Sequence, residues 1–250
     1  MDFDLSWLLL GLPITFVLGW FASRIDLRQL RFENRQAPKA YFKGLNYLLN
    51  EQQDKAIEVF LKLAEYNRDT VETHLALGNL FRRRGEVDRA LRVHQNLIAR
   101  PGPSDDEQTT ALLELGEDYM RAGLLDRAET LFSDLVAMDA LAPSALRHLI
   151  GIYQHERDWG KAIEHARQLE LASDESQAAT IAQFQCELAD QARAQGNFEE
   201  ARARVEDAFA VDPDCGRACM IQGHVEAAAG NLEAAIRAFE RVAELDVDYL

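Results

Sequence analysis

A short pattern that recurs with a period of about 34 residues constrains this chain more than any other feature. In each copy a turn residue, usually glycine, stands five positions before an alanine. The alanine is present in all six copies, at Ala56, Ala90, Ala128, Ala162, Ala201 and Ala235. Successive alanine numbers differ by 34, 38, 34, 39 and 34, and the two longer intervals contain the loop-like segments ARPGPSDDEQ and ASDESQ. Such a period predicts a solenoid whose units pack on their sequence neighbours.

Each copy reads as two helices joined by a tight turn. Glycine is expected to end the first helix in a left-handed conformation at Gly85, Gly123, Gly196 and Gly230, and Glu51 and Arg157 depart from this rule. Further glycines in the first helices allow close approach, at Gly44, Gly78, Gly116 and Gly223. The predicted packing residues include Val87, Leu125, Trp159, Phe198 and Leu232 after the turn, and Phe60, Phe132 and Phe239 in the second helices.

A two-helix unit of about 34 residues resembles the tetratricopeptide repeat (TPR). Only six prolines and fourteen glycines interrupt a chain rich in helix-forming residues. The predicted fold class is therefore all-α: a TPR helical-hairpin solenoid of about six repeats, preceded by one transmembrane helix. The solenoid is expected over residues 37–250, with repeats starting near residues 37, 71, 109, 143, 182 and 216.

The N-terminus has the features of a membrane anchor. Residues 5–22 carry no charge, and 18 residues of helix span about 27 Å, the short end for a bilayer. Trp7 and Trp20 lie near its two ends, where indole rings favour the headgroup layer. A cleaved signal peptide would need a basic start, but Asp2 and Asp4 precede the apolar run. We expect an uncleaved transmembrane anchor over residues 1–23.

The charges after the anchor predict its orientation. Six basic residues follow it, against Asp26 and Glu33: Arg24, Arg28, Arg31, Arg35, Lys39 and Lys43. The positive-inside rule places the N-terminus on the outer side of the membrane and the body in the cytoplasm. Residues 24–36 form a basic juxtamembrane stalk in this interpretation, and contact with anionic headgroups is plausible.

Composition and motifs argue against several functions. The formal net charge of −15 is the wrong sign for binding nucleic acid. Cys186, Cys215 and Cys219 lack a second cysteine pair or suitably spaced histidines, so we predict core thiols and no metal site. The chain contains no P-loop, nucleophile-elbow or zinc-protease motif, and its six histidines are scattered. We predict no catalytic residues, no cofactor and no small-molecule substrate.

Protein partners are expected on the concave face formed by the first helices of the repeats. The predicted groove residues are Asn79, Arg82, Arg83, Glu117, Arg121, Arg147, Asp190 and Arg193. An ordinary solvated face explains any one of them equally well. The cluster of Arg82, Arg83 and Arg121 is the strongest candidate, because three guanidinium groups stand out in an acidic protein and can pair with a partner's carboxylates.

Three stretches carry a more specific resemblance: NYLLNEQQDKAIEVFL, THLALGNLFRRRGEVDRALRVHQNLIARP and LGEDYMRAGLLDRAETLF. They resemble the lipopolysaccharide assembly protein B family of Gram-negative bacteria, over essentially the whole chain. The resemblance implies a regulator of lipopolysaccharide synthesis in the bacterial inner membrane, so that the N-terminus would lie in the periplasm and the body in the cytoplasm. Family members act as adaptors that deliver the deacetylase LpxC, which commits precursors to lipid A, to the membrane protease FtsH.

The chain also departs from that family. Members continue through further repeats into a rubredoxin-like metal domain with paired C-x-x-C motifs, whereas Cys215 and Cys219 do not match those motifs. We expect the sequence to be a fragment, or its sixth hairpin to be covered by something else. Two other functions stay open: a scaffold that gathers lipopolysaccharide-synthesis enzymes without a role in proteolysis, and an enzyme whose active part lies in a missing C-terminus.

Overall fold

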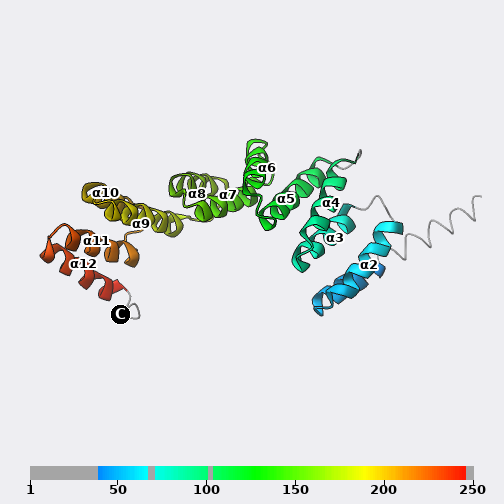
Figure 1. Cartoon of the computed structure of the whole chain (residues 1–250), viewed down its shortest axis with the longest axis horizontal. Coiled ribbons are helices and arrows are strands. Elements are labelled where there is room, and N and C mark those ends of the chain that lie inside the picture. The colour runs from blue at the N-terminus through cyan, green and yellow to red at the C-terminus, as the bar shows by residue number, and fades with distance from the viewer. Residues whose placement is uncertain (1–38, 67–70, 101–103, 246–250) are drawn as a thin grey trace, which may run out of the picture. The chain divides into compact units, whose positions relative to one another are not determined.

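A computed structural model describes residues 39–66, 71–100 and 104–245. These residues form twelve helices and no strand, as the all-α prediction requires (Figure 1). A first helix covers residues 39–49. It is followed by α2 (Gln53–Tyr66), α3 (Val71–Arg84), α4 (Val87–Ile98), α5 (Asp105–Arg121), α6 (Leu125–Ala137), α7 (Ala142–Glu156), α8 (Trp159–Ala172), α9 (Ala178–Ala194), α10 (Phe198–Val211), α11 (Gly216–Ala228) and α12 (Leu232–Leu245).

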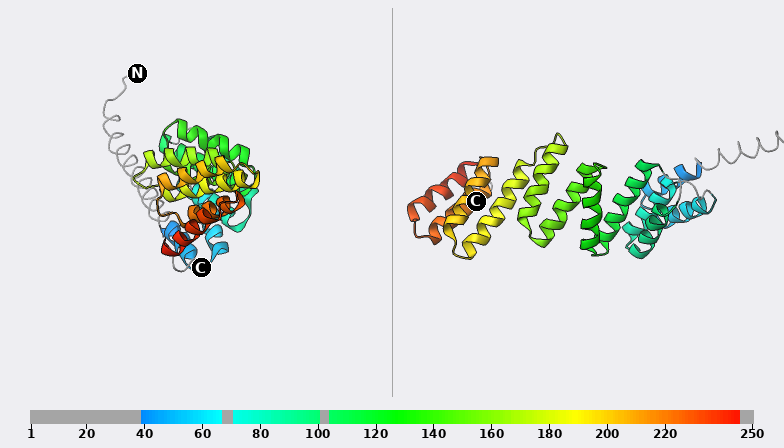
Figure 2. Two further views of the ribbon diagram at one scale, coloured as in Figure 1. Left: turned by 90° about the vertical axis from the view of Figure 1, so that its left-hand side faces the viewer. Right: turned by 90° about the horizontal axis from the view of Figure 1, so that it is seen from above.

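The chain divides into two compact units, one that ends at Pro103 and one that begins at Ser104. In the first unit α3 packs against both α2 and α4. In the second unit α5 pairs with α6, α7 with α8, α9 with α10 and α11 with α12, so four hairpins follow one another (Figure 2). The second helix of each hairpin contacts the first helix of the next, which is the packing of a TPR solenoid.

The turns inside the hairpins share one backbone conformation. Gly85, Gly123, Gly196 and Gly230 have φ between +75° and +87°, as predicted for residues that end a helix. Glu51 and Arg157 take the same left-handed conformation, with φ of +57° and +60°, although a side chain there costs about 1–2 kcal/mol. At Arg157 the turn closes with Asp158 N–H donating to the Tyr153 carbonyl at 2.9 Å. The hydrogen bonds of the hairpin therefore impose the turn even where glycine is missing.

Small residues let the two helices of a hairpin approach closely. All six repeat alanines are at most 3% exposed. A Cβ added to Gly116 would lie 2.5 Å from Phe132 Cε1, and one added to Gly223 would lie 2.3 Å from Phe239 Cε1. The same relation pairs Gly78 with the fully buried His94, which takes the aromatic position in the second repeat. Glycine is required here by space rather than by backbone conformation.

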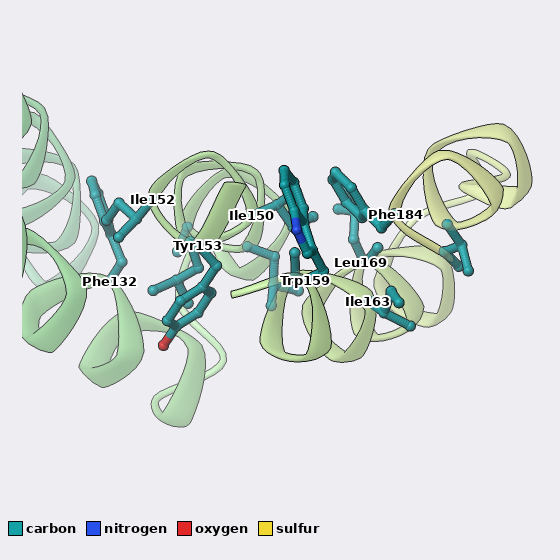
Figure 3. Packing of buried hydrophobic residues seen from close by; sticks show 14 of the residues in the cluster. Phe132, Ile150, Ile152, Tyr153, Trp159, Ile163, Leu169 and Phe184 are labelled. Atoms are coloured by element: carbon teal, nitrogen blue, oxygen red, sulfur yellow. The ribbon is translucent and has the colours of Figure 1, made fainter. Parts of the chain in front are cut away.

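The largest core cluster lies in the second unit and crosses several repeats (Figure 3). The rings of Trp159 and Phe184 stack with centroids 5.6 Å apart, so α8 and α9 share one apolar contact. The prediction that Leu232 packs at the equivalent position is wrong, because Leu232 is 66% exposed while Trp159 is 8% exposed. Trp159 is covered by Phe184 of the next repeat, whereas no described helix follows α12. Phe239 is likewise only partly buried.

The predicted anchor over residues 1–23 and the stalk over residues 24–36 lie outside the described residues. Within the described ranges, no helix combines the length and apolar character that crossing a membrane requires.

Candidate protein-binding surface

All eight predicted groove residues lie on first helices of the hairpins. They are Asn79, Arg82 and Arg83 on α3, Glu117 and Arg121 on α5, Arg147 on α7, and Asp190 and Arg193 on α9. Arg83, Arg121 and Arg147 are exposed, and the other five are partly buried. The predicted cluster of three arginines includes residues of both compact units, since Arg82 and Arg83 belong to the first unit and Arg121 to the second. It stays a prediction.

Several of these side chains form ion pairs on the surface of the second unit. Arg147 Nη2 lies 2.8 Å from Glu175 Oε2, and both side chains are about half exposed or more. Arg193 Nη2 lies 2.7 Å from Asp190 Oδ1 on the same helix. Exposed pairs of this kind contribute little to stability, so a partner can exchange them for its own charges at small cost.

Polar side chains also link consecutive first helices. His148 Nε2 on α7 lies 3.3 Å from Glu117 Oε1 on α5, and the His148 ring stacks on Phe132 with centroids 4.7 Å apart. On the next pair of first helices, Arg217 of α11 donates to Gln183 Oε1 of α9 at 3.1 Å and also pairs with Glu187. The sequence-based prediction included Glu117 but missed His148, Gln183, Glu187 and Arg217. The signal was available, since His148 and Glu187 stand at the same repeat position.

A second kind of polar pair joins one hairpin to the next at two junctions, α6–α7 and α10–α11, and is part of the scaffold. Glu129 on α6 accepts a 2.6 Å hydrogen bond from the Tyr153 hydroxyl on α7, and burial together with this carboxylate raises the pKa of Tyr153. Glu226 on α11 accepts from Arg202 Nε on α10 at 2.7 Å, and this bond lowers the pKa of Glu226. Glu129 and Arg202 occupy the same repeat position, one turn before the buried aromatic or its replacement.

The three cysteines are buried and reduced, as predicted for core thiols. Cys186 on α9 and Cys215, which precedes α11, share one apolar cluster. A hydrogen bond from the Cys186 thiol lowers the pKa of Cys215, helped by backbone N–H groups at the start of α11, whereas burial opposes the shift. Among the described residues no three His, Cys, Asp or Glu side chains are grouped to hold a metal ion. The absence of a cofactor stays a prediction.

Comparison with known proteins identifies the repeats of this chain. A model described as "Tetratricopeptide repeat" matches residues 113–178 and 186–246, and a second TPR model matches residues 73–107. The chain belongs to the tetratricopeptide-repeat family. A solved structure of the C-terminal part of a TPR repeat-containing protein from Cytophaga hutchinsonii superposes with a TM-score of 0.56 at 13% identity, covering 82% of this chain and 78% of that one. That likeness concerns the fold alone.

The more specific resemblance is confirmed as well. Lipopolysaccharide assembly protein B of Escherichia coli (strain K12) is 38% identical over 97% of this TPR chain. The protein of that name from Haemophilus influenzae is 34% identical over the same share. The chain spans 62–63% of the length of these relatives. The TPR repeats indicate a protein-interaction role for this chain.

Proposed function

We propose that this TPR chain is a non-catalytic adaptor at the bacterial inner membrane that regulates lipid A synthesis. It binds the deacetylase LpxC and presents it to the membrane protease FtsH. The observation that carries the proposal is the 38% identity with lipopolysaccharide assembly protein B over 97% of the chain. The resemblance of the three sequence stretches to that family supplies the two partners.

The chemistry of the described surface supports binding rather than catalysis. Several polar side chains of α5, α7, α9 and α11 form ion pairs with one another, and Arg147 of α7 pairs with Glu175 in the segment before α9. The buried His94 packs on Gly78 as the phenylalanines do in other repeats. A rigid array of charged, exchangeable side chains suits recognition of a folded protein or a peptide.

The half-life of LpxC tests the proposal. After synthesis of this TPR protein is shut off, we expect LpxC to persist several-fold longer, because the protease no longer receives it. Re-expression of the chain should restore turnover only while FtsH is active. An unchanged half-life, with the lipopolysaccharide enzymes dispersed from the membrane, would favour the scaffold function instead.

A further inference from the structure

The first described helix exposes an unusual mixture of residues along one side. Phe42 is 68% exposed and Leu49 is 84% exposed, and they lie about two helical turns apart on one stripe. The other exposed residues of the segment 39–50 are Lys39, Lys43, Asn46 and Asn50. The side contains two lysines and two large apolar residues and no acidic residue, in a chain of net charge −15. We call these six residues the basic-apolar face.

Comparison with the later repeats shows that the two lysines replace buried residues. The position of Lys39 holds Thr73, Ala111, Ala145, Phe184 and Ala218 in repeats two to six, and all five are at most 4% exposed. The position of Lys43 holds Leu77, Leu115 and Leu149 in repeats two to four, all buried. In repeats two, four, five and six the first helix packs on the helix that precedes it. Lysine at both positions therefore gives the first repeat an outer surface that is not built to receive another hairpin.

Phe42 and Leu49 differ from the later repeats in the opposite way, because they are large apolar residues at positions where several later repeats have polar ones. The position of Leu49 holds Arg83, Arg121 and His155 in repeats two to four, all exposed. The position of Phe42 holds the polar residues Glu114, His148 and Glu187 in repeats three to five, and Ala76 and the buried Ile221 in repeats two and six. Leu49 stands at a position that is exposed in every later repeat, and Phe42 is 68% exposed where repeat six buries Ile221, so neither large apolar side chain is used for packing in the first repeat. A surface of this composition needs an occupant that accepts cations and apolar side chains together.

We propose that the basic-apolar face lies on an anionic lipid surface, with Phe42 and Leu49 entering the headgroup and acyl boundary and Lys39 and Lys43 contacting lipid phosphates. Interfacial helices combine apolar and basic side chains in this way, and each lysine near an anionic leaflet adds to the attraction. The stems of the lysines can lie along apolar surface while their ammonium groups stay in water.

The inference rests on the proposed membrane anchor, because that segment would deliver the face to a bilayer. The apolar segment ends at Ala22, and only the short stretch 23–38 separates it from Lys39. The first repeat would then be docked flat on the membrane rather than tethered at a distance, and the surface that receives LpxC would be held at a fixed height relative to a membrane protease.

Fluorescence quenching on the full chain tests the docking. Leu49→Cys is labelled with an environment-sensitive dye, and the three native thiols are buried. The protein is inserted into nanodiscs of phosphatidylcholine and phosphatidylglycerol that contain a lipid with a shallow spin label. Leu171→Cys is the matched control, since Leu171 is an equally exposed leucine, 89%, on α8. Resistance to alkaline carbonate extraction reports anchor insertion for every sample.

We expect the spin-labelled lipid to quench the dye at residue 49 at least about twofold more than the dye at residue 171. Lys39→Gln with Lys43→Gln, or nanodiscs of phosphatidylcholine alone, should remove most of that difference. Quenching of the dye at residue 49 by a water-soluble agent alone, and not by the spin-labelled lipid, would overturn the docking. Protection of the dye from both quenchers would also overturn it, because protein would then cover the face. Extraction by carbonate would refute the anchor and the docking together, whereas an inserted chain with residue 49 in water refutes the docking alone.

Discussion

The ring of Phe132 lies directly against the backbone of Gly116, where an added methyl group would lie 2.5 Å from Cε1. Gly151 offers the opposite situation on α7, because a methyl group there would have no neighbour within 4 Å. Space therefore excludes alanine at Gly116 but not at Gly151.

We predict that Gly116→Ala lowers the free energy of unfolding by about 1–3 kcal/mol, because the α5–α6 hairpin becomes overpacked. Gly151→Ala should instead raise it by about 0.5–1 kcal/mol, since alanine favours an exposed helix interior more than glycine does. Urea denaturation of both variants measures the difference. Equal effects of the same sign would contradict the packing of α5 on α6.

The Arg202–Glu226 pair predicts a pH dependence of stability. Hydrogen bonds from Arg202 and Asn231 hold the pKa of Glu226 below its ordinary value. The folded state then binds fewer protons than the unfolded state, so the stabilisation is complete above the ordinary carboxyl pKa and is lost as the pH falls through the lowered pKa.

We expect the wild-type melting temperature to fall more steeply between about pH 5 and about pH 3 than that of Glu226→Gln. Glu199→Gln is the control, because Glu199 also pairs with Arg202 but its side chain is 92% exposed. Parallel profiles for the wild type and Glu226→Gln would show that this pair does not titrate between folded and unfolded states.

Charge reversal tests the predicted recognition surface. Arg82→Glu with Arg83→Glu should reduce capture of LpxC about tenfold or more, because a favourable charge contact becomes repulsive. Arg92→Glu with Arg167→Glu makes the same change in net charge on two residues of second helices, and it should leave capture unchanged. Melting curves must agree among the three proteins. Undiminished capture by the first variant would move recognition away from α3.

The topology of the proposed anchor gives a fourth prediction. Fused after Leu250, a fluorescent protein that matures only in the cytoplasm should be bright, and alkaline phosphatase at the same site should be inactive, because the basic residues after residue 22 retain the body inside. Active phosphatase, or a mature N-terminus that starts after Ala22, would contradict this orientation.

Much of the hairpin could be predicted because its determinants are local. The alanines and the turn glycines act on helices that adjoin in the chain, so their spacing was enough to predict helix, turn and helix. The repeat spacing predicts the turn even where glycine is missing, since Glu51 and Arg157 adopt the left-handed conformation against the preference of their own side chains. The groove residues stay a prediction, and His148 and Arg217, which link consecutive first helices, were not singled out from the sequence.

The amino-acid sequence by itself determined the repeat and its two helices, because a hairpin is closed by contacts between segments that are close together in the chain. Only the tertiary structure decided which faces are covered. Trp159 and Leu232 hold one repeat position, yet one is buried against Phe184 and the other is exposed. Lys39 and Thr73 likewise hold one repeat position, on the other side of the repeat, and Lys39 is exposed whereas Thr73 is buried. The face of a hairpin is buried only where a neighbouring hairpin packs on it. The residues of one hairpin do not by themselves determine whether that neighbour is present.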